Sequence, residues 1–163
     1  MNKKKIIGIC GYSGSGKTTL LKQVIPLLIK QGVNVGSLKH AHHDIELDIP
    51  GKDSYELRKA GSVQTAIVCD NRYAIIHETP NKPADLTTLI NQFTDVDIIL
   101  IEGFKHEKIP KIICHRQTIN HPVFIDDFTL AIASDNQLDI SIPLLDINQP
   151  QQVVKFILDY LLN

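Results

Sequence analysis

A glycine-rich segment with the sequence GYSGSGKTT occupies residues 11–19. Its glycines allow left-handed backbone angles, so that successive N–H groups turn inward and form a nest for an anion. Lys17 adds a positive charge that can reach the β- and γ-phosphates of a nucleotide, and Thr18 adds a hydroxyl ligand for Mg²⁺. Two glycines five residues apart, followed by Lys and a hydroxyl residue, are the pattern of a P-loop.

The segments on both sides of this loop support that interpretation. Residues 6–10 are a short apolar, β-branched run typical of a buried strand, and apolar residues recur at helical spacing after Lys17. A helix that begins at the loop adds the positive end of its dipole to the nest. We therefore predict that the nucleotide contacts come from the loop and the first helical turn: Gly11, Ser13, Gly14, Ser15, Gly16, Lys17, Thr18 and Thr19.

A second signal is the apolar run 97–101, which ends in Glu102 and Gly103. An acid at the carboxyl end of a buried strand has the position of a Walker-B residue, which holds Mg²⁺ through water or orients an attacking water. We predict that Lys17 and Glu102 are the catalytic residues, and that Thr18 and Glu102 contact the metal. Asp97 begins the same strand, so we expect it at the opposite sheet edge in a structural role.

The polar segment 39–54 follows a predicted strand at 33–38 and lacks regular periodicity. In P-loop folds such a segment forms a switch or substrate loop. Asp44 and Asp48 are candidates for a magnesium contact, and Asp48 is the one we assign to the metal. His40, His42 and His43 suit Zn²⁺ or Ni²⁺, but their spacing fits no standard closed zinc site.

The residue that reads the nucleotide base is predicted from position alone. Asp135 follows a predicted strand at 130–133 and could accept hydrogen bonds from N1 and N2 of guanine. The string at 81–85, NKPAD, has one residue too many for the guanine-reading motif Asn-Lys-x-Asp and precedes a predicted helix, so we reject it.

The remaining pattern predicts an α/β fold with one domain over residues 1–163. Strands alternate with helices, which favours a mainly parallel sheet with helices on both faces, the three-layer fold of P-loop NTPases. An added β-hairpin is expected from strands 63–69 and 72–77. Its turn would contain Asp70 and Asn71, residue types that tolerate the positive φ of a tight hairpin turn. Further strands are predicted at 111–115 and 123–125, and helices at 53–61, 83–93 and 149–162, with Pro26 kinking or loosening the first helix.

Composition limits the classes of function. The 163 residues are 43% hydrophobic and 21% charged with a net charge of −1, which argues against a nucleic-acid binder that relies on phosphate electrostatics. The basic run Lys3–Lys5 precedes only five apolar residues, too few for a signal peptide or a membrane span, so we expect a cytoplasmic protein. Cys10, Cys69 and Cys114 are expected to be buried free thiols.

Six strings spread over nearly the whole chain carry a more specific resemblance: residues 14–21, 39–44, 48–61, 102–107, 133–135 and 144–148. The most specific are PGKDS at 50–54 and EGFK at 102–105. With these strings the chain resembles the MobB family, GTP-binding proteins associated with molybdopterin guanine dinucleotide biosynthesis.

The resemblance implies a P-loop GTPase fold, weak Mg²⁺-dependent GTP hydrolysis and a homodimer. It also implies an adapter or GTP supplier for the guanylyltransferase that joins GMP to molybdopterin, with that enzyme and molybdopterin-bearing proteins as partners. Carried over to this sequence, Ser15, Gly16, Lys17 and Thr18 bind phosphates and metal, and Glu102 is the Walker-B acid.

Two other functions are compatible with the motifs. A small-molecule kinase on the same fold usually carries a lid with several arginines, whereas the arginines here, Arg58, Arg72 and Arg116, are not clustered in sequence. Since no arginine finger is evident either, we expect slow hydrolysis. A metal-delivery GTPase would use His40, His42 and His43 as ligands.

Overall fold

The computed structural model of the protein describes residues 4–41, 45–119 and 121–162. Contacts divide the chain into two compact units, one formed by Met1–His40 with Phe93–Asn163 and one formed by Ala41–Gln92. Among the residues that the structure describes, no helix is both long and apolar enough to cross a membrane.

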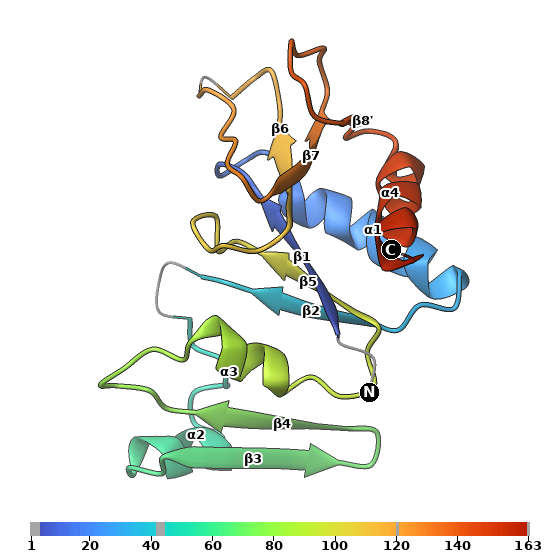
Figure 1. Ribbon diagram of the computed structural model, residues 1–163. Coiled ribbons are helices and arrows are strands. Elements are labelled where there is room, and N and C mark those ends of the chain that lie inside the picture. The colour runs from blue at the N-terminus through green and yellow to red at the C-terminus, as the bar shows by residue number, and fades with distance from the viewer. Residues whose placement is uncertain (1–3, 42–44, 120, 163) are drawn as a thin grey trace. The chain divides into compact units, whose positions relative to one another are not determined.

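The larger unit is built on a six-stranded sheet in which all paired strands are parallel (Figure 1). The strand order is β2-β5-β1-β6-β7-β8. The strands are β1 (Lys5–Cys10), β2 (Val35–Lys39), β5 (Ile98–Glu102), β6 (Lys111–His115), β7 (Thr129–Ser134) and β8 (Leu144–Asp146). This parallel sheet, together with an antiparallel hairpin, confirms the predicted fold class.

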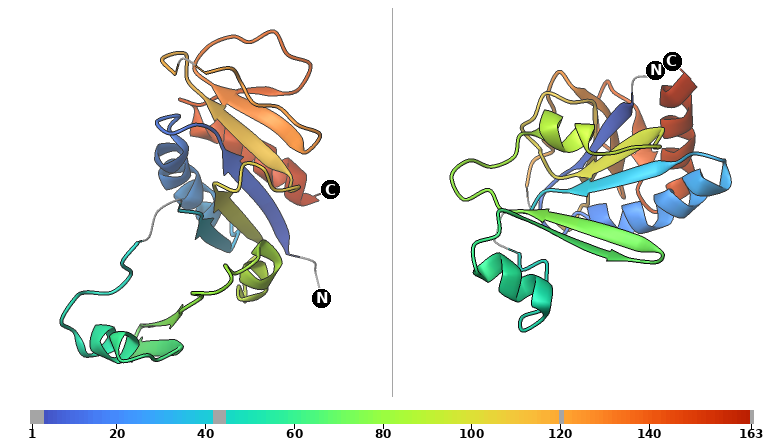
Figure 2. Two further views of the ribbon diagram at one scale, coloured as in Figure 1. Left: turned by 90° about the vertical axis from the view of Figure 1, so that its left-hand side faces the viewer. Right: turned by 90° about the horizontal axis from the view of Figure 1, so that it is seen from below.

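Side chains that alternate along the central strands divide the core between the two sheet faces. Ile7 and Ile9 of β1 and Leu100 of β5 belong to a cluster with the buried residues of α1 (Lys17–Lys30) and α4 (Pro150–Leu162). These two helices lie side by side on that face (Figure 2). On the other face, Ile113 and Ile132 pack against partly buried side chains of the non-helical segments 123–124 and 138–142.

Helix α1 begins where the sequence predicts, directly after the glycine loop. Its N-cap is Gly16 in a left-handed conformation, with φ of 85°. The helix runs through Pro26 as one element and ends at Lys30, and Gly32 follows with φ of 80°. A glycine in this conformation is a common helix terminator, because it carries no Cβ to clash.

Three segments differ from the predicted secondary structure. No strand forms at 123–125, where Val123 and Phe124 fill the core without joining the sheet. Strand β8 was not predicted, because it has only three residues and directly follows Pro143. Helix α3 spans Leu86–Asn91 instead of 83–93, since the Asp85 side chain accepts the Thr88 N–H as an N-cap. That hydrogen bond also lowers the pKa of Asp85.

The smaller unit contains α2 (Asp53–Lys59), α3 and the hairpin of β3 (Gln64–Cys69) and β4 (Arg72–His77). The predicted hairpin is confirmed, with Cys69 paired to Arg72 across a two-residue turn. Two details differ from prediction. In the described part of the chain the non-glycine residues with positive φ are Asp95 and Phe104, so the turn residues do not use it. Cys69 is exposed, whereas Cys10 and Cys114 are buried as expected.

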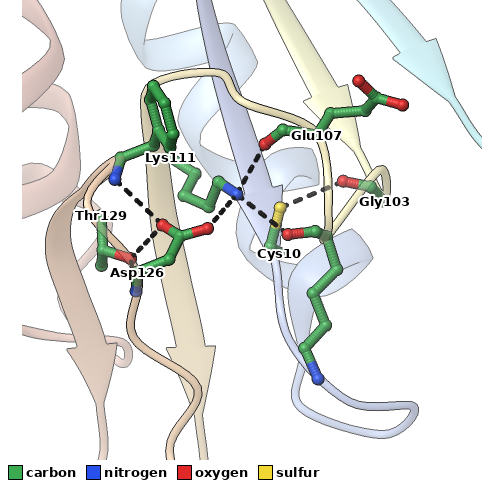
Figure 3. Close-up of polar contacts among 8 residues, drawn as sticks. Cys10, Gly103, Glu107, Lys111, Asp126 and Thr129 are labelled. Atoms are coloured by element: carbon green, nitrogen blue, oxygen red, sulfur yellow. Dashed lines mark hydrogen bonds and ion pairs between the residues drawn. The ribbon is translucent and has the colours of Figure 1, made fainter.

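A fully buried lysine ties the segment after β5 to the start of β7. The Nζ of Lys111 donates to the carbonyls of Lys105 and Glu107, at 2.9 and 2.8 Å, and to Asp126 Oδ2 at 2.7 Å (Figure 3). Asp126 also accepts from the Thr129 hydroxyl. Because a buried ammonium is costly without partners, these contacts fix the path of the chain just beyond Glu102.

Hydrogen bonds decide the charge state of Asp126. Partial burial works to raise its pKa, but the hydrogen bonds from Lys111, Thr129 and the Phe128 N–H outweigh that effect and hold the pKa below its ordinary value. The stabilisation by ionised Asp126 is therefore present above the ordinary carboxyl pKa, near 4, and is lost as the pH falls through the lowered value.

We predict that Asp126→Asn lowers the free energy of unfolding at pH 7 by about 3 kcal/mol, because it leaves the buried Lys111 ammonium without its carboxylate. Urea denaturation at several pH values measures the effect, and the difference from wild type should shrink as the pH falls below about 4. The exposed neighbour in Asp127→Asn is the matched control. Equal stability of both variants at pH 7 would contradict this role of the ion pair.

Candidate nucleotide-binding site

The glycines of the loop adopt the conformations that the motif requires. Gly14 and Gly16 have φ of 80° and 85°, and Gly11 has φ of 142°. A Cβ on Gly11 would lie 2.4 Å from the Cys114 carbonyl oxygen and 2.7 Å from Ser15 Oγ, so no side chain fits there. A Cβ on Gly14 would meet no atom within 4 Å, which leaves that part of the loop open.

Lys17 turns its ammonium back onto the loop. Its Nζ donates to the carbonyls of Gly11 at 3.0 Å and Tyr12 at 2.8 Å. These acceptors are neutral, and a phosphate oxygen makes a stronger, charge-assisted hydrogen bond with the same ammonium. The lysine is therefore held at the loop by contacts that an anion can replace.

Glu102 and Thr18 meet as predicted, although they come from distant parts of the chain. The Thr18 hydroxyl lies 2.9 and 3.0 Å from the two carboxylate oxygens of Glu102. Lys39 at the end of β2 forms an ion pair with Glu102 Oε1 at 3.1 Å, and the Glu102 side chain is only 13% exposed. The parallel register causes this meeting, since Ile9, Lys39 and Glu102 are aligned at the same sheet edge.

The remaining predicted loop residues differ in exposure. Ser13, Gly14, Thr18 and Thr19 are exposed, whereas Ser15 is buried. The Ser15 hydroxyl has no hydrogen-bond partner in the described structure. An open glycine turn, a displaceable lysine and a hydroxyl beside a carboxylate have the chemistry that a magnesium-bound triphosphate needs, so these residues fit that ligand.

Asp135 lies at the same sheet edge, directly after β7, and its carboxylate is already engaged. Its Oδ1 accepts the Gln117 N–H at 2.8 Å, and Arg116 Nη1 lies 3.4 Å from its Oδ2. The pKa of Asp135 is lowered, chiefly by the hydrogen bond from the Gln117 amide and further by the charge of Arg116. Arg116 Nη1 also donates to Asn148 Oδ1 at 3.2 Å.

The other predicted metal ligands are His40, residues of the smaller unit, and residues outside the described ranges. Asp48 belongs to the smaller unit, where its Oδ1 accepts the N–H of Ile49. His42, His43 and Asp44 lie outside the described residues. Within residues 4–41, 45–119 and 121–162, no three His, Cys, Asp or Glu side chains come together as a metal site. The His40 ring stacks on Phe104, with centroids 4.2 Å apart.

Comparison with known proteins shows the family of this chain. The family described as "Molybdopterin guanine dinucleotide synthesis protein B", MobB, matches residues 6–135. The chain belongs to the MobB family. Its sequence is 47% identical to a molybdopterin-guanine dinucleotide biosynthesis adapter protein of Haemophilus influenzae, covering 98% of this chain and 91% of that protein. The corresponding Escherichia coli protein is 43% identical, with 96% and 93% covered.

A solved MobB structure also matches this fold. The crystal structure of Bacillus subtilis MobB aligns with a TM-score of 0.76 at 29% identity, over 95% of this chain and 96% of that one. The likeness supports the P-loop NTPase fold of the MobB family for this chain. The aligned residues include both units described above, since they make up 95% of this chain.

Two positive residues beside the loop were missed by the sequence analysis. Arg116 directly follows β6, and Lys105 follows β5, with its Nζ 4.0 Å from the centroid of the Tyr12 ring. Tyr12 also stacks with His121, with centroids 4.4 Å apart. One signal could have found both lysine and arginine: parallel strands place their carboxyl ends at one sheet edge, and both residues come just after such an end.

Proposed function

We propose that this protein binds GTP with Mg²⁺ at the P-loop, hydrolyses it slowly, and acts as an adapter in molybdopterin guanine dinucleotide biosynthesis. The observation that carries the proposal is the meeting of Lys17, Thr18 and Glu102 at the N-terminus of α1. The adapter role follows the names of the relatives from Haemophilus influenzae and Escherichia coli.

In this proposal the loop amides and the dipole of α1 hold the phosphates. Lys17 exchanges the carbonyls of Gly11 and Tyr12 for phosphate oxygens. Thr18 is the hydroxyl ligand of Mg²⁺, and Glu102 accepts hydrogen bonds from its water shell. Asp48 is retained as a proposed further contact to the metal, and Asp135 as the proposed reader of guanine. The bound metal supplies charge that stabilises the transferred phosphoryl group.

Slow hydrolysis is consistent with the surroundings of Glu102. A residue that orients the attacking water needs a carboxylate oxygen that faces it. Here the carboxylate pairs with Lys39, so another donor competes for its oxygens. Slow turnover suits a protein whose nucleotide state matters more than its rate of reaction.

The proposed partners are the guanylyltransferase that joins GMP to molybdopterin and the proteins that carry molybdopterin. In that setting the chain supplies GTP or stabilises the complex, and it works in the cytoplasm. Binding of GTP at its nucleotide site would then depend on the concentration of GTP.

We further propose a homodimer in which the hairpin packs against a second copy of the chain. Val68 and Tyr73 form a cross-strand pair and are 79% and 73% exposed, and Ile75 on the same face is 61% exposed. Two isolated strands are only marginally stable in water, and their outer edges present unpaired backbone groups. A second copy supplies both an apolar surface and a strand to pair with.

We predict that Lys17→Ala weakens GTP binding by roughly 100-fold, because it removes charge-assisted hydrogen bonds to the phosphates. Isothermal titration with Mg²⁺ present measures this affinity, and wild type should prefer GTP to ATP. Lys22→Ala removes an exposed lysine from the same helix and is the matched control. If wild type binds no GTP, or if both variants bind it as wild type does, the proposed function is wrong.

We predict that Val68→Lys converts the protein from dimer to monomer, because it places a charge in the proposed apolar contact. Sedimentation equilibrium at micromolar concentration measures the mass. Ile29→Lys makes the same kind of change at an exposed residue of α1 and should leave the dimer intact. A monomeric wild type, or a Val68→Lys variant that remains dimeric, argues against the hairpin interface.

A further inference from the structure

Arg116 lies against the residue that caps α1. A Cβ built on Gly16 would lie 3.1 Å from Arg116 Nε and 3.4 Å from its Nη2. Two nitrogens of the guanidinium thus face the backbone of the phosphate loop at the start of the helix. Arg116 follows β6, the neighbour of β1, so the parallel sheet delivers it to this place.

Two side chains from neighbouring strand ends hold the third nitrogen of Arg116. Nη1 donates to Asn148 Oδ1 at 3.2 Å and to Asp135 Oδ2 at 3.4 Å. Both partners are themselves fixed by backbone contacts: Asp135 accepts the Gln117 N–H, and the Asn148 N–H donates to Asp146. The guanidinium is therefore oriented by Nη1 while Nε and Nη2 remain on the side of Gly16.

The charge at this position is unfavourable without an anion. The N-terminus of a helix carries a partial positive charge, so a cation beside it is repelled. Lys17, the first residue of the same helix, adds a second cation. Asp135 offsets part of this repulsion, but the pair is partly exposed, with side chains 27% and 21% accessible, and water screens it. A bound phosphate would turn the repulsion into attraction.

We propose that Arg116 is a phosphate-binding residue of the nucleotide site, and that Asp135 and Asn148 are positioning residues that aim it at the loop. This inference rests on the proposed function, since it takes the P-loop as the place where phosphates bind. Asp135, predicted from the sequence as a reader of guanine, then also acts through Arg116. An arginine suits this task, because its planar fork can hold a carboxylate with one nitrogen and phosphate oxygens with the others.

The test separates the phosphates from the base by titrating two probes, GTP and inorganic tripolyphosphate, each with Mg²⁺. Arg116→Ala should weaken both by the same factor, roughly 10- to 100-fold, as expected for the loss of charge-assisted hydrogen bonds. Arg116→Lys should recover part of the affinity for both. Arg72→Ala, which removes an arginine from the hairpin, is the matched control and should bind both probes as wild type does.

The positioning role of Asp135 leads to a second, separate prediction. Asp135→Asn should weaken tripolyphosphate binding by less than Arg116→Ala does. It should add no further loss of tripolyphosphate affinity in the double variant, because both changes act on this probe through one guanidinium. Thermal melts check that the variants are folded. If Arg116→Ala does not fold, Arg116→Gln, which keeps a donor for Asn148, replaces it in the same titrations.

The outcomes distinguish this inference from the function on which it rests. If Arg116→Ala binds both probes as wild type does while Lys17→Ala binds neither, Arg116 is not a phosphate ligand and the P-loop function stands. Loss of GTP binding with unchanged tripolyphosphate binding would overturn the inference as well, because Arg116 would then act on the base. A wild type that binds neither probe overturns both proposals.

Discussion

The concentration of positive charge at the N-terminus of α1 is the constraint on which the site depends. The helix dipole, Lys17 and Arg116 all lie there. Lys17 rests on two neutral carbonyls, and Arg116 shares a partly exposed ion pair with Asp135. An incoming phosphate would therefore meet preorganised donors instead of having to assemble them.

The parallel sheet makes this concentration possible. Its strands come from both halves of the sequence, but their carboxyl ends share one edge. Glu102 and Arg116 therefore reach the start of α1 from two strands, and Asp135 contacts Arg116 from a third. Buried polar contacts then fix the connections beyond that edge. The ammonium of Lys111 holds the carbonyls of Lys105 and Glu107 in place. A buried ammonium needs a partner for each of its three donors, and few other paths of the chain would supply them.

Features encoded by local sequence were predictable, and features that depend on distant partners were not. The glycine loop, the start of α1 and the hairpin follow from turn chemistry and periodicity within a few residues. The position of Glu102 beside Thr18 was also predictable, because the motif and an apolar strand together define it. Arg116 belongs to no motif: only its position just after a strand marks it, and its partner Asn148 is 32 residues away. The missing strand at 123–125 was decided by packing, which periodicity does not encode, and β8 has only three residues, too few for a periodic pattern.

The most direct test of this account is a crystal structure of the protein with a non-hydrolysable GTP analogue and Mg²⁺. The account predicts that the triphosphate lies on the amides of the loop, that Lys17 Nζ leaves the carbonyls of Gly11 and Tyr12 for phosphate oxygens, and that the Thr18 hydroxyl leaves Glu102 for the metal. A nucleotide bound elsewhere, or one that leaves the Lys17 and Thr18 contacts unchanged, would contradict it.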